Sequence, residues 1–123
     1  MRIVAATDLP MHTITQFGSN RATIGGLTRG DSAFQLGMLR LEPAGILGAH
    51  PATSPQLLVV ISGEGWVSSS DSIKHPIQRG SAVYWSAGEM HETTADTELT
   101  AVIFEADDFT TLVPTNNVQS DPQ

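Results

Sequence analysis

Short apolar segments separated by turn-forming residues limit what this chain can fold into. Gly, Pro and Ser recur at short intervals, and no segment keeps the 3.6-residue apolar period of an amphipathic helix. The intervening segments are rich in Val, Ile, Leu and Thr, which favour strands. We expect strands at residues 21–28, 33–42, 55–62, 65–70, 72–78, 81–86, 90–95 and 98–106. Eight short strands with closely spaced turns predict an all-β sandwich or barrel.

Composition narrows the possible partners and locations. Six basic and thirteen acidic residues give a net charge of −7, which argues against nucleic acid or an anionic membrane as a partner. No apolar run approaches the roughly 18 residues of a membrane span, and the N-terminus lacks the apolar core of a signal peptide. We therefore expect a cytoplasmic protein. The absence of cysteine excludes disulfides and thiolate metal ligands.

At 123 residues, the chain is long enough for one domain and too short for two. We expect this domain to span residues 1–113, followed by a polar tail over 114–123. Gly63 and Gly65 suggest a hairpin between the strands at 55–62 and 65–70, because glycine readily adopts a positive φ. Four apolar side chains are expected in the core: Phe34, Met38, Ile103 and Phe104.

Two histidines and a glutamine are candidates for a common site. His50 and His91 each follow a glycine-containing turn on separate expected strands, and Gln56 begins an apolar strand. Period-2 alternation turns Gln56, Leu58 and Val60 to one face. If that face is the interior of a barrel, His50, Gln56 and His91 can converge against Leu58 and Val60. Two neutral imidazoles and an amide oxygen could hold a divalent transition metal such as Zn, Fe, Ni or Mn.

The spacing of these residues resembles the first signature motif of the cupin superfamily, a group of small double-sheet β-barrels. That motif runs Gly, five residues, His-x-His, three or four residues, Glu, six residues and Gly. The corresponding positions of this chain are Gly45, His50, Ala52, Gln56 and Gly63. The second histidine and the glutamate of the family pattern are thus replaced by Ala52 and Gln56.

The second cupin motif is also recognisable. It runs Gly, five residues, Pro-x-Gly, two residues, His, three residues and Asn. The corresponding positions are Gly80, Ser86, Gly88, His91 and Ala95. The resemblance implies a double-stranded β-helix, or jelly-roll cupin barrel, with its core motifs over residues 45–95.

The resemblance leaves two functions open. One is a metal-assisted enzyme of lyase, isomerase or oxygenase type acting on a small polar, oxygen-rich molecule, with His50, Gln56 and His91 as the metal ligands. The alternative is a non-catalytic small-molecule binding or sensing domain without metal. Cupins resembling this chain serve many functions, so no catalytic residue is assigned. We also expect a homodimer, because the N-terminal segment and the tail would otherwise leave unpaired strand edges.

The remaining polar residues receive simpler interpretations. The segment EADD at 105–108 is expected to be a solvated acidic turn. Asp107 or Asp108 could act as a general base only if the preceding strand ends at the mouth of the pocket. His75 is expected on the surface, and His12 is expected to be structural or exposed.

Overall fold

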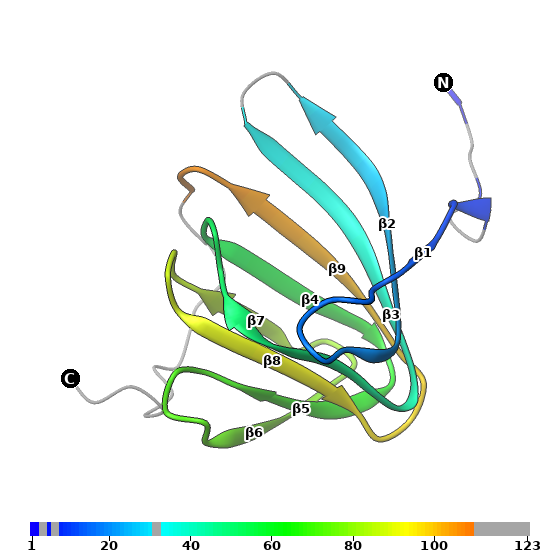
Figure 1. The fold of residues 1–123 in the computed structure, drawn as a ribbon. Coiled ribbons are helices and arrows are strands. Elements are labelled where there is room, and N and C mark those ends of the chain that lie inside the picture. Colours follow the sequence, from blue (N-terminus) through cyan, green and yellow to red (C-terminus); the bar gives the residue numbers. More distant parts are fainter. Residues whose placement is uncertain (3–4, 6–7, 31–32, 110–123) are drawn as a thin grey trace.

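The computed structural model describes all residues except 3–4, 6–7, 31–32 and 110–123, and the described residues form antiparallel strands without an α-helix (Figure 1). The strands are β1 (His12–Thr13), β2 (Asn20–Gly30), β3 (Phe34–Pro51), β4 (Gln56–Ser62), β5 (Glu64–Ser68), β6 (Lys74–Gln78), β7 (Ala82–Trp85), β8 (Met90–Ala95) and β9 (Leu99–Ala106). All eight expected strands are present. The predicted all-β class is therefore confirmed. No helix in this part of the chain is long and apolar enough to span a membrane.

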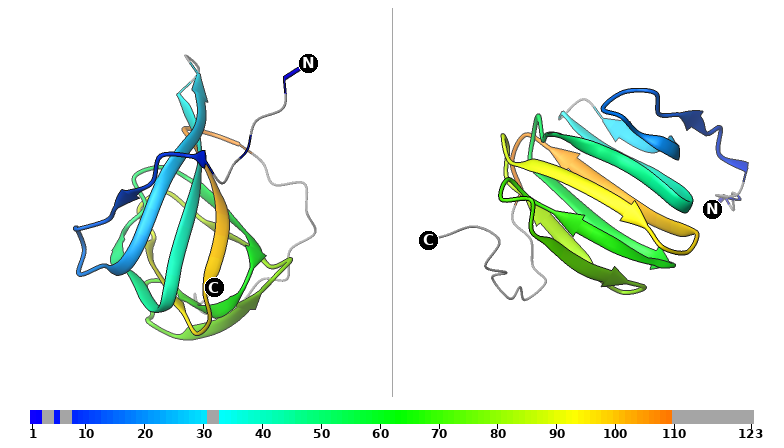
Figure 2. Two further views of the ribbon diagram at one scale, coloured as in Figure 1. Left: turned by 90° about the vertical axis from the view of Figure 1, so that its right-hand side faces the viewer. Right: turned by 60° about the horizontal axis from the view of Figure 1, so that its bottom comes forward.

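Strand β3 joins two sets of strands into one curled sheet. Its residues 34–41 pair with β2 and β9, and its residues 46–51 pair with β8. Between them the strand bends at Ala44, which has a φ of 66°. The strand order β6-β5-β8-β3-β9-β4-β7 therefore wraps around a common interior, as the two views in Figure 2 show. The expected strand at 33–42 thus continues to Pro51, which brings His50 into the sheet.

The expected hairpin at Gly63 and Gly65 is wrong. Strand β4 pairs with β7 and β9, whereas β5 pairs with β6 and β8, so the chain crosses here between two parts of the sheet. Gly63 has the positive φ expected of it, at 92°, but Gly65 does not. A side chain at Gly65 would instead collide with the backbone of Thr94 on β8. This glycine is required by the close approach of two strands.

The interior is filled by the inward-facing residues that alternate along the strands β2 to β9. Leu39, Leu41, Leu58, Val60 and Leu99 are almost completely buried. Of the four residues expected in the core, Ile103 is buried, whereas Phe34, Met38 and Phe104 are only partly buried. They lie on the opposite face of their strands from Leu39 and Ile103, because neighbouring side chains on a strand point to opposite sides. The predicted tail at 114–123 and the domain end at 113 lie outside the described residues.

Candidate metal and ligand site at one end of the barrel

Five strands end or begin at the same end of the barrel and place polar side chains there. His50 near the end of β3 is the Cα partner of His91 near the start of β8. Gln56 at the start of β4 is the Cα partner of Trp85 on β7 and of Glu105 on β9. Because directly opposed residues of antiparallel strands project to the same face, each set shares one side of the sheet. Figure 1 shows these strands curling around one interior.

The two histidines are in contact and lie within a row of rings. The ring centroids of His50 and His91 are 4.1 Å apart, with an interplanar angle of 55°. Phe17 stacks on His50 at 3.9 Å and 10°, and Trp85 lies 5.0 Å from His91. The row runs from the partly exposed Phe17 to the buried Trp85. Both imidazoles are therefore held between neighbouring rings, which limits their rotation.

Hydrogen bonding defines which nitrogen of His50 is free. Its Nδ1 lies 2.7 Å from the carbonyl oxygen of Gly48. A carbonyl oxygen can only accept, so Nδ1 carries a hydrogen, and in the neutral form of the ring Nε2 carries the lone pair. A hydrogen bond of this kind is typical of histidines whose other nitrogen binds a metal.

His91 presents a buried nitrogen without a partner. Its side chain is 2% exposed, and its Nε2 atom has no hydrogen-bond partner. Burial, and secondarily the nearby charge of His50, lower the pKa of His91 to about 4. The ring is therefore neutral near pH 7 and able to bind a metal or a ligand proton. Buried polar atoms in native proteins usually have a hydrogen-bond partner or a bound ion. We therefore expect a ligand atom or a metal ion to bind at this unpaired nitrogen.

The turn between β7 and β8 is braced by Glu89. Its carboxylate accepts hydrogen bonds from the backbone N–H of Ser86, at 2.9 Å, and from the hydroxyl of Ser69. Gly88 supplies the positive φ of this turn, at 84°. Because β8 begins directly after the turn, these contacts fix the entry of His91 into the site.

Ala52 is tied to the same turn. Its N–H donates to the Glu89 carbonyl at 2.9 Å, and its carbonyl accepts from the Gly88 N–H at 2.7 Å. The residue is 2% exposed. The position that holds the second histidine in the cupin motif is therefore buried at the edge of this site.

Gly48 positions Phe17 over His50. The N–H of Gly48 donates to the Ser19 hydroxyl at 3.1 Å. A Cβ at Gly48 would overlap the carbonyl oxygen of Phe17, so only glycine lets the turn before β2 approach this closely. Phe17 was not predicted as a site residue, because a contact between segments about 30 residues apart has no local signal in the sequence.

Glu105 was also missed, and the expected solvated turn at 105–108 is wrong for this residue. Glu105 lies on β9 and is partly buried, while Asp107 and Asp108 beyond the strand are exposed. Burial raises the pKa of Glu105, and the charge of His50 opposes that rise. The strand does end at the site, but its inward-facing carboxylate is Glu105. Counting by twos from Ile103 could have indicated this orientation.

The other two histidines lie away from this site. His12 on β1 is exposed. His75 on β6 was expected on the surface, but it is partly buried and its Nε2 atom is buried without a partner. On β6, His75 lies on the same face of the strand as the buried Ile77, two residues further on. The surface expectation is therefore wrong for His75.

The predicted site residues have donors for a weakly held metal. Gln56 is 7% exposed, and Leu58 and Val60 continue the same buried face of β4. In the described part of the chain, no three His, Asp, Glu or Cys side chains lie close enough to hold a metal ion. The donor set that the sequence predicts is the imidazole nitrogens of His50 and His91 with the amide oxygen of Gln56. These neutral donors suit a divalent transition metal that keeps open coordination positions.

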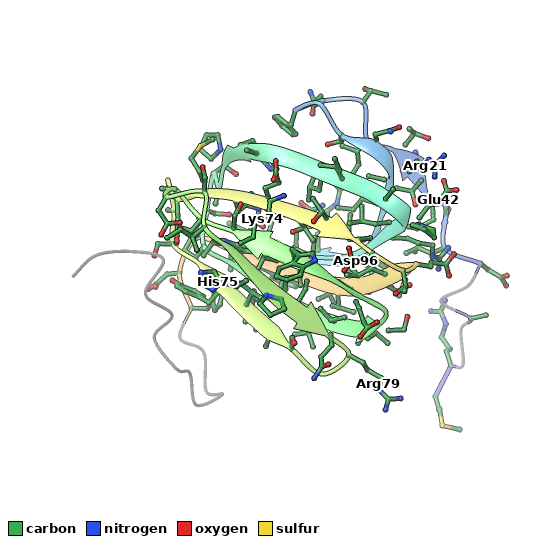
Figure 3. The ribbon with its side chains drawn as sticks, turned by 90° about the horizontal axis from the view of Figure 1, so that it is seen from below. Arg21, Glu42, Lys74, His75, Arg79 and Asp96 are labelled. Atoms are coloured by element: carbon green, nitrogen blue, oxygen red, sulfur yellow. The ribbon has the colours of Figure 1, made fainter. Side chains whose placement is uncertain are left out.

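A shallow hollow lies elsewhere, on the outer surface of the barrel. Its volume is about 370 Å³, and Trp66, Lys74, Thr94 and Asp96 contribute to its lining. The Trp66 indole N–H donates to the Asp96 carboxylate at 3.0 Å. Figure 3 shows Lys74 and Asp96 on this side of the molecule. The hollow is lined by residues of β3, β5, β6 and β8 together with Asp96, and it does not include either site histidine.

Solved structures with the same fold come from several different proteins. The polyketide cyclase RemF from Streptomyces resistomycificus is 18% identical, with a TM-score of 0.77 over 88% of this chain and 80% of that chain. A predicted oxalate decarboxylase from Thermotoga maritima is 18% identical, with a TM-score of 0.75 over 85% and 98%. An RmlC-like cupin from Shewanella frigidimarina is 11% identical, with a TM-score of 0.73 over 88% and 92%.

No family model and no curated protein sequence matches the chain. The curled antiparallel sheet and these structural neighbours nevertheless define a jelly-roll β-barrel. The particular fold is that of the cupins, as the two sequence motifs predicted. At these identities, the likeness establishes the fold alone.

Proposed function

We propose that the chain binds a small polar, oxygen-rich molecule at the end of the barrel that carries His50, Gln56 and His91, with a divalent transition metal as cofactor. The observation that carries this proposal is the buried, unpartnered Nε2 atom of His91, 4.1 Å between ring centroids from a second histidine with a free Nε2. Two such nitrogens on neighbouring rings are suited to share one cation or one ligand.

His50 and His91 would hold the metal through Nε2, and Gln56 would add its amide oxygen. A divalent metal in such a site polarises a carbonyl or carboxylate oxygen of a bound molecule. Leu58 and Val60 line the barrel below these donors and exclude water. Because the donor set is neutral, the charge of the metal is not reduced by its protein ligands. The site therefore fits a metal-assisted enzyme of lyase, isomerase or oxygenase type.

The names of two structural neighbours are in keeping with this class. They are described as a polyketide cyclase and a predicted oxalate decarboxylase, both of which are named for activity on small organic molecules. Their reactions are not carried over to this chain, because only the fold is shared at 18% identity.

Metal analysis of protein purified without a histidine tag tests this function. We expect Zn, Fe, Ni or Mn near one equivalent in the wild type and a loss of that metal in His91→Ala. His12→Ala is a matched control, because His12 is exposed on β1 and lies outside the site. Equal metal content in wild type and His91→Ala would contradict the proposed ligand set.

A metal-free binding or sensing domain is the second candidate. It is favoured by the finding that no third His, Asp, Glu or Cys joins the two histidines among the described residues. In that case His50 and His91 would hydrogen-bond the ligand directly. Wild-type protein that takes up no metal, even when Zn²⁺ is supplied, would select this function over the first.

We also propose that the protein forms a homodimer through the outer face of β3, β9, β4 and β7. Support comes from a row of apolar side chains across these four strands, formed by Leu36, Phe104, Leu57 and Tyr84 as successive Cα partners. Tyr84 remains 39% exposed. Exposed apolar areas of this kind are typical of protein interfaces.

A further inference from the structure

We infer that Glu105 supplies the negative charge of the site, in place of the glutamate that the cupin motif has at the position of Gln56. This inference rests on the proposed metal site. It adds a positioning residue that neither motif contains, since Glu105 lies on β9, beyond both of them.

The register of the sheet places Glu105 beside the position that lost its charge. Glu105 and Gln56 are direct Cα partners across β4 and β9. On β9 the residues two and four positions before Glu105, Ile103 and Ala101, are buried in the core. Glu105 therefore projects from the inward face at the end of its strand, next to Gln56. The Glu105 carboxylate therefore lies one strand away from position 56, where the cupin motif has its glutamate.

Glu105 is partly buried at this end of the barrel, where its Cα partner Gln56 is buried. A carboxylate that loses hydration without gaining a cation is destabilised. A metal ion bound by His50 and His91 would offset that cost, and the carboxylate would in turn strengthen binding of the ion.

Glu105 acts on the metal through space and through the ligand rather than as a direct metal ligand. His50, His91 and Glu105 do not form a group that can hold one ion, since no such trio occurs among the described residues. Its carboxylate oxygens can instead accept a hydrogen bond from a metal-bound water or from a hydroxyl of the bound molecule. The ligand class this favours is a small molecule with a hydroxyl beside its metal-binding oxygen.

Zn²⁺ affinity in competition with a chromogenic chelator tests the inference without knowledge of the substrate. We expect Glu105→Gln to weaken Zn²⁺ binding about tenfold, which corresponds to about 1.4 kcal/mol. Glu98→Gln is the matched control, because it removes the same charge from an exposed residue just before the other end of β9. It should bind Zn²⁺ as the wild type does. Urea unfolding of each metal-free variant checks that a loss of affinity is not a loss of fold.

Transposing the charge gives the decisive comparison. The double variant Gln56→Glu/Glu105→Gln returns a carboxylate to the motif position, and we expect it to regain Zn²⁺ affinity to within about threefold of the wild type. If the wild type binds Zn²⁺ and Glu105→Gln binds it with the same affinity, this inference is overturned and the metal site still stands. A wild type that binds no Zn²⁺ would overturn the metal site itself, and this inference with it.

Discussion

At the scale of single residues, His91 is the side chain whose chemistry is most altered by its surroundings. Burial and the neighbouring His50 lower its pKa from 6.5 to about 4. Between these two values the unfolded chain binds a proton at this position and the folded protein does not. By linkage, the stability contributed by neutral His91 is complete above about pH 6.5 and is lost as the pH falls toward 4.

The pH dependence of unfolding measures this effect. We expect His91 to cost the metal-free protein up to about 3 kcal/mol of unfolding free energy between pH 6.5 and 4. In His91→Gln this part of the pH dependence should disappear, so urea unfolding of both proteins at several pH values isolates it. Glu105 contributes with the opposite sign, because a raised carboxyl pKa favours the folded state at low pH. Parallel profiles for the two proteins would show that His91 does not titrate in this range.

Ala52 offers a second residue-scale prediction. Its buried position, two residues after His50 at the edge of the site, is where the cupin motif has another histidine. We expect Ala52→His to tighten Zn²⁺ binding at least tenfold, or about 1.4 kcal/mol, by adding a ligand. Thr94→His is the control, because Thr94 lies on the outer face of β8. Unchanged affinity in a folded Ala52→His variant would mean that position 52 does not face the metal.

The sequence could predict the partnership of His50 and His91 but not their whole environment. The spacing of two motifs was enough to pair them, and the structure makes them direct neighbours across β3 and β8. Phe17 and Glu105 were missed for different reasons. Phe17 contacts His50 from a segment that is distant in the sequence. Glu105 belongs to the acidic segment 105–108, whose composition suggested exposure and did not indicate that this one side chain points inward.

At the scale of elements, the contact between β3 and the turn before β2 depends on a single missing side chain. Gly48 is buried, and a Cβ there would overlap the Phe17 carbonyl oxygen. Ser19 adds a hydrogen bond from its hydroxyl to the Gly48 N–H. The turn, and with it the ring that covers His50, can occupy this place only while position 48 is glycine.

Gly48→Ala should therefore destabilise the protein by about 2 kcal/mol, measured by urea unfolding, because the turn must move away from β3. Gly26→Ala is a matched control. Gly26 also lies in a strand, but a Cβ there would meet no atom within 4 Å. We expect the control to change stability by less than about 1 kcal/mol. Equal effects of the two substitutions would show that the turn does not rest on Gly48.

Apart from β3, which continues nine residues beyond its expected end to Pro51, the expected strands were placed to within a few residues, whereas strand partners were not predictable. Residues 90–95 match β8 in full, since alternation and flanking turns are local signals. The supposed hairpin at Gly63 failed because β4 and β5 bind other strands, and those partners are set by the curl of the whole sheet. Phe104 was misplaced for the same reason. Its apolar character indicated burial, but it did not indicate which face of the sheet the side chain lies on.

At the scale of the whole molecule, the outer face of the β3-β9-β4-β7 part of the sheet carries two rows of apolar side chains. Beside the row that includes Leu57, a second row of Cα partners joins Met38, Val102 and Val59. Phe109 packs against Tyr84 and Phe104, with ring centroids 5.6 and 5.0 Å away. The opposite outer face, over β8, β5 and β6, instead carries polar groups such as Thr94 and Lys74. Two such different faces favour association through only one of them.

Sedimentation equilibrium tests that association. We expect the wild type to have twice the 13.1 kDa chain mass at micromolar concentration. Leu57→Lys should shift it to the single-chain mass, because a lysine in the middle of the apolar row would place a charge within the interface. Thr94→Lys adds the same charge to the opposite outer face and should leave the dimer intact. A wild type with the mass of one chain would exclude the dimer, and a dimer lost only in Thr94→Lys would place the interface over β8 and β5.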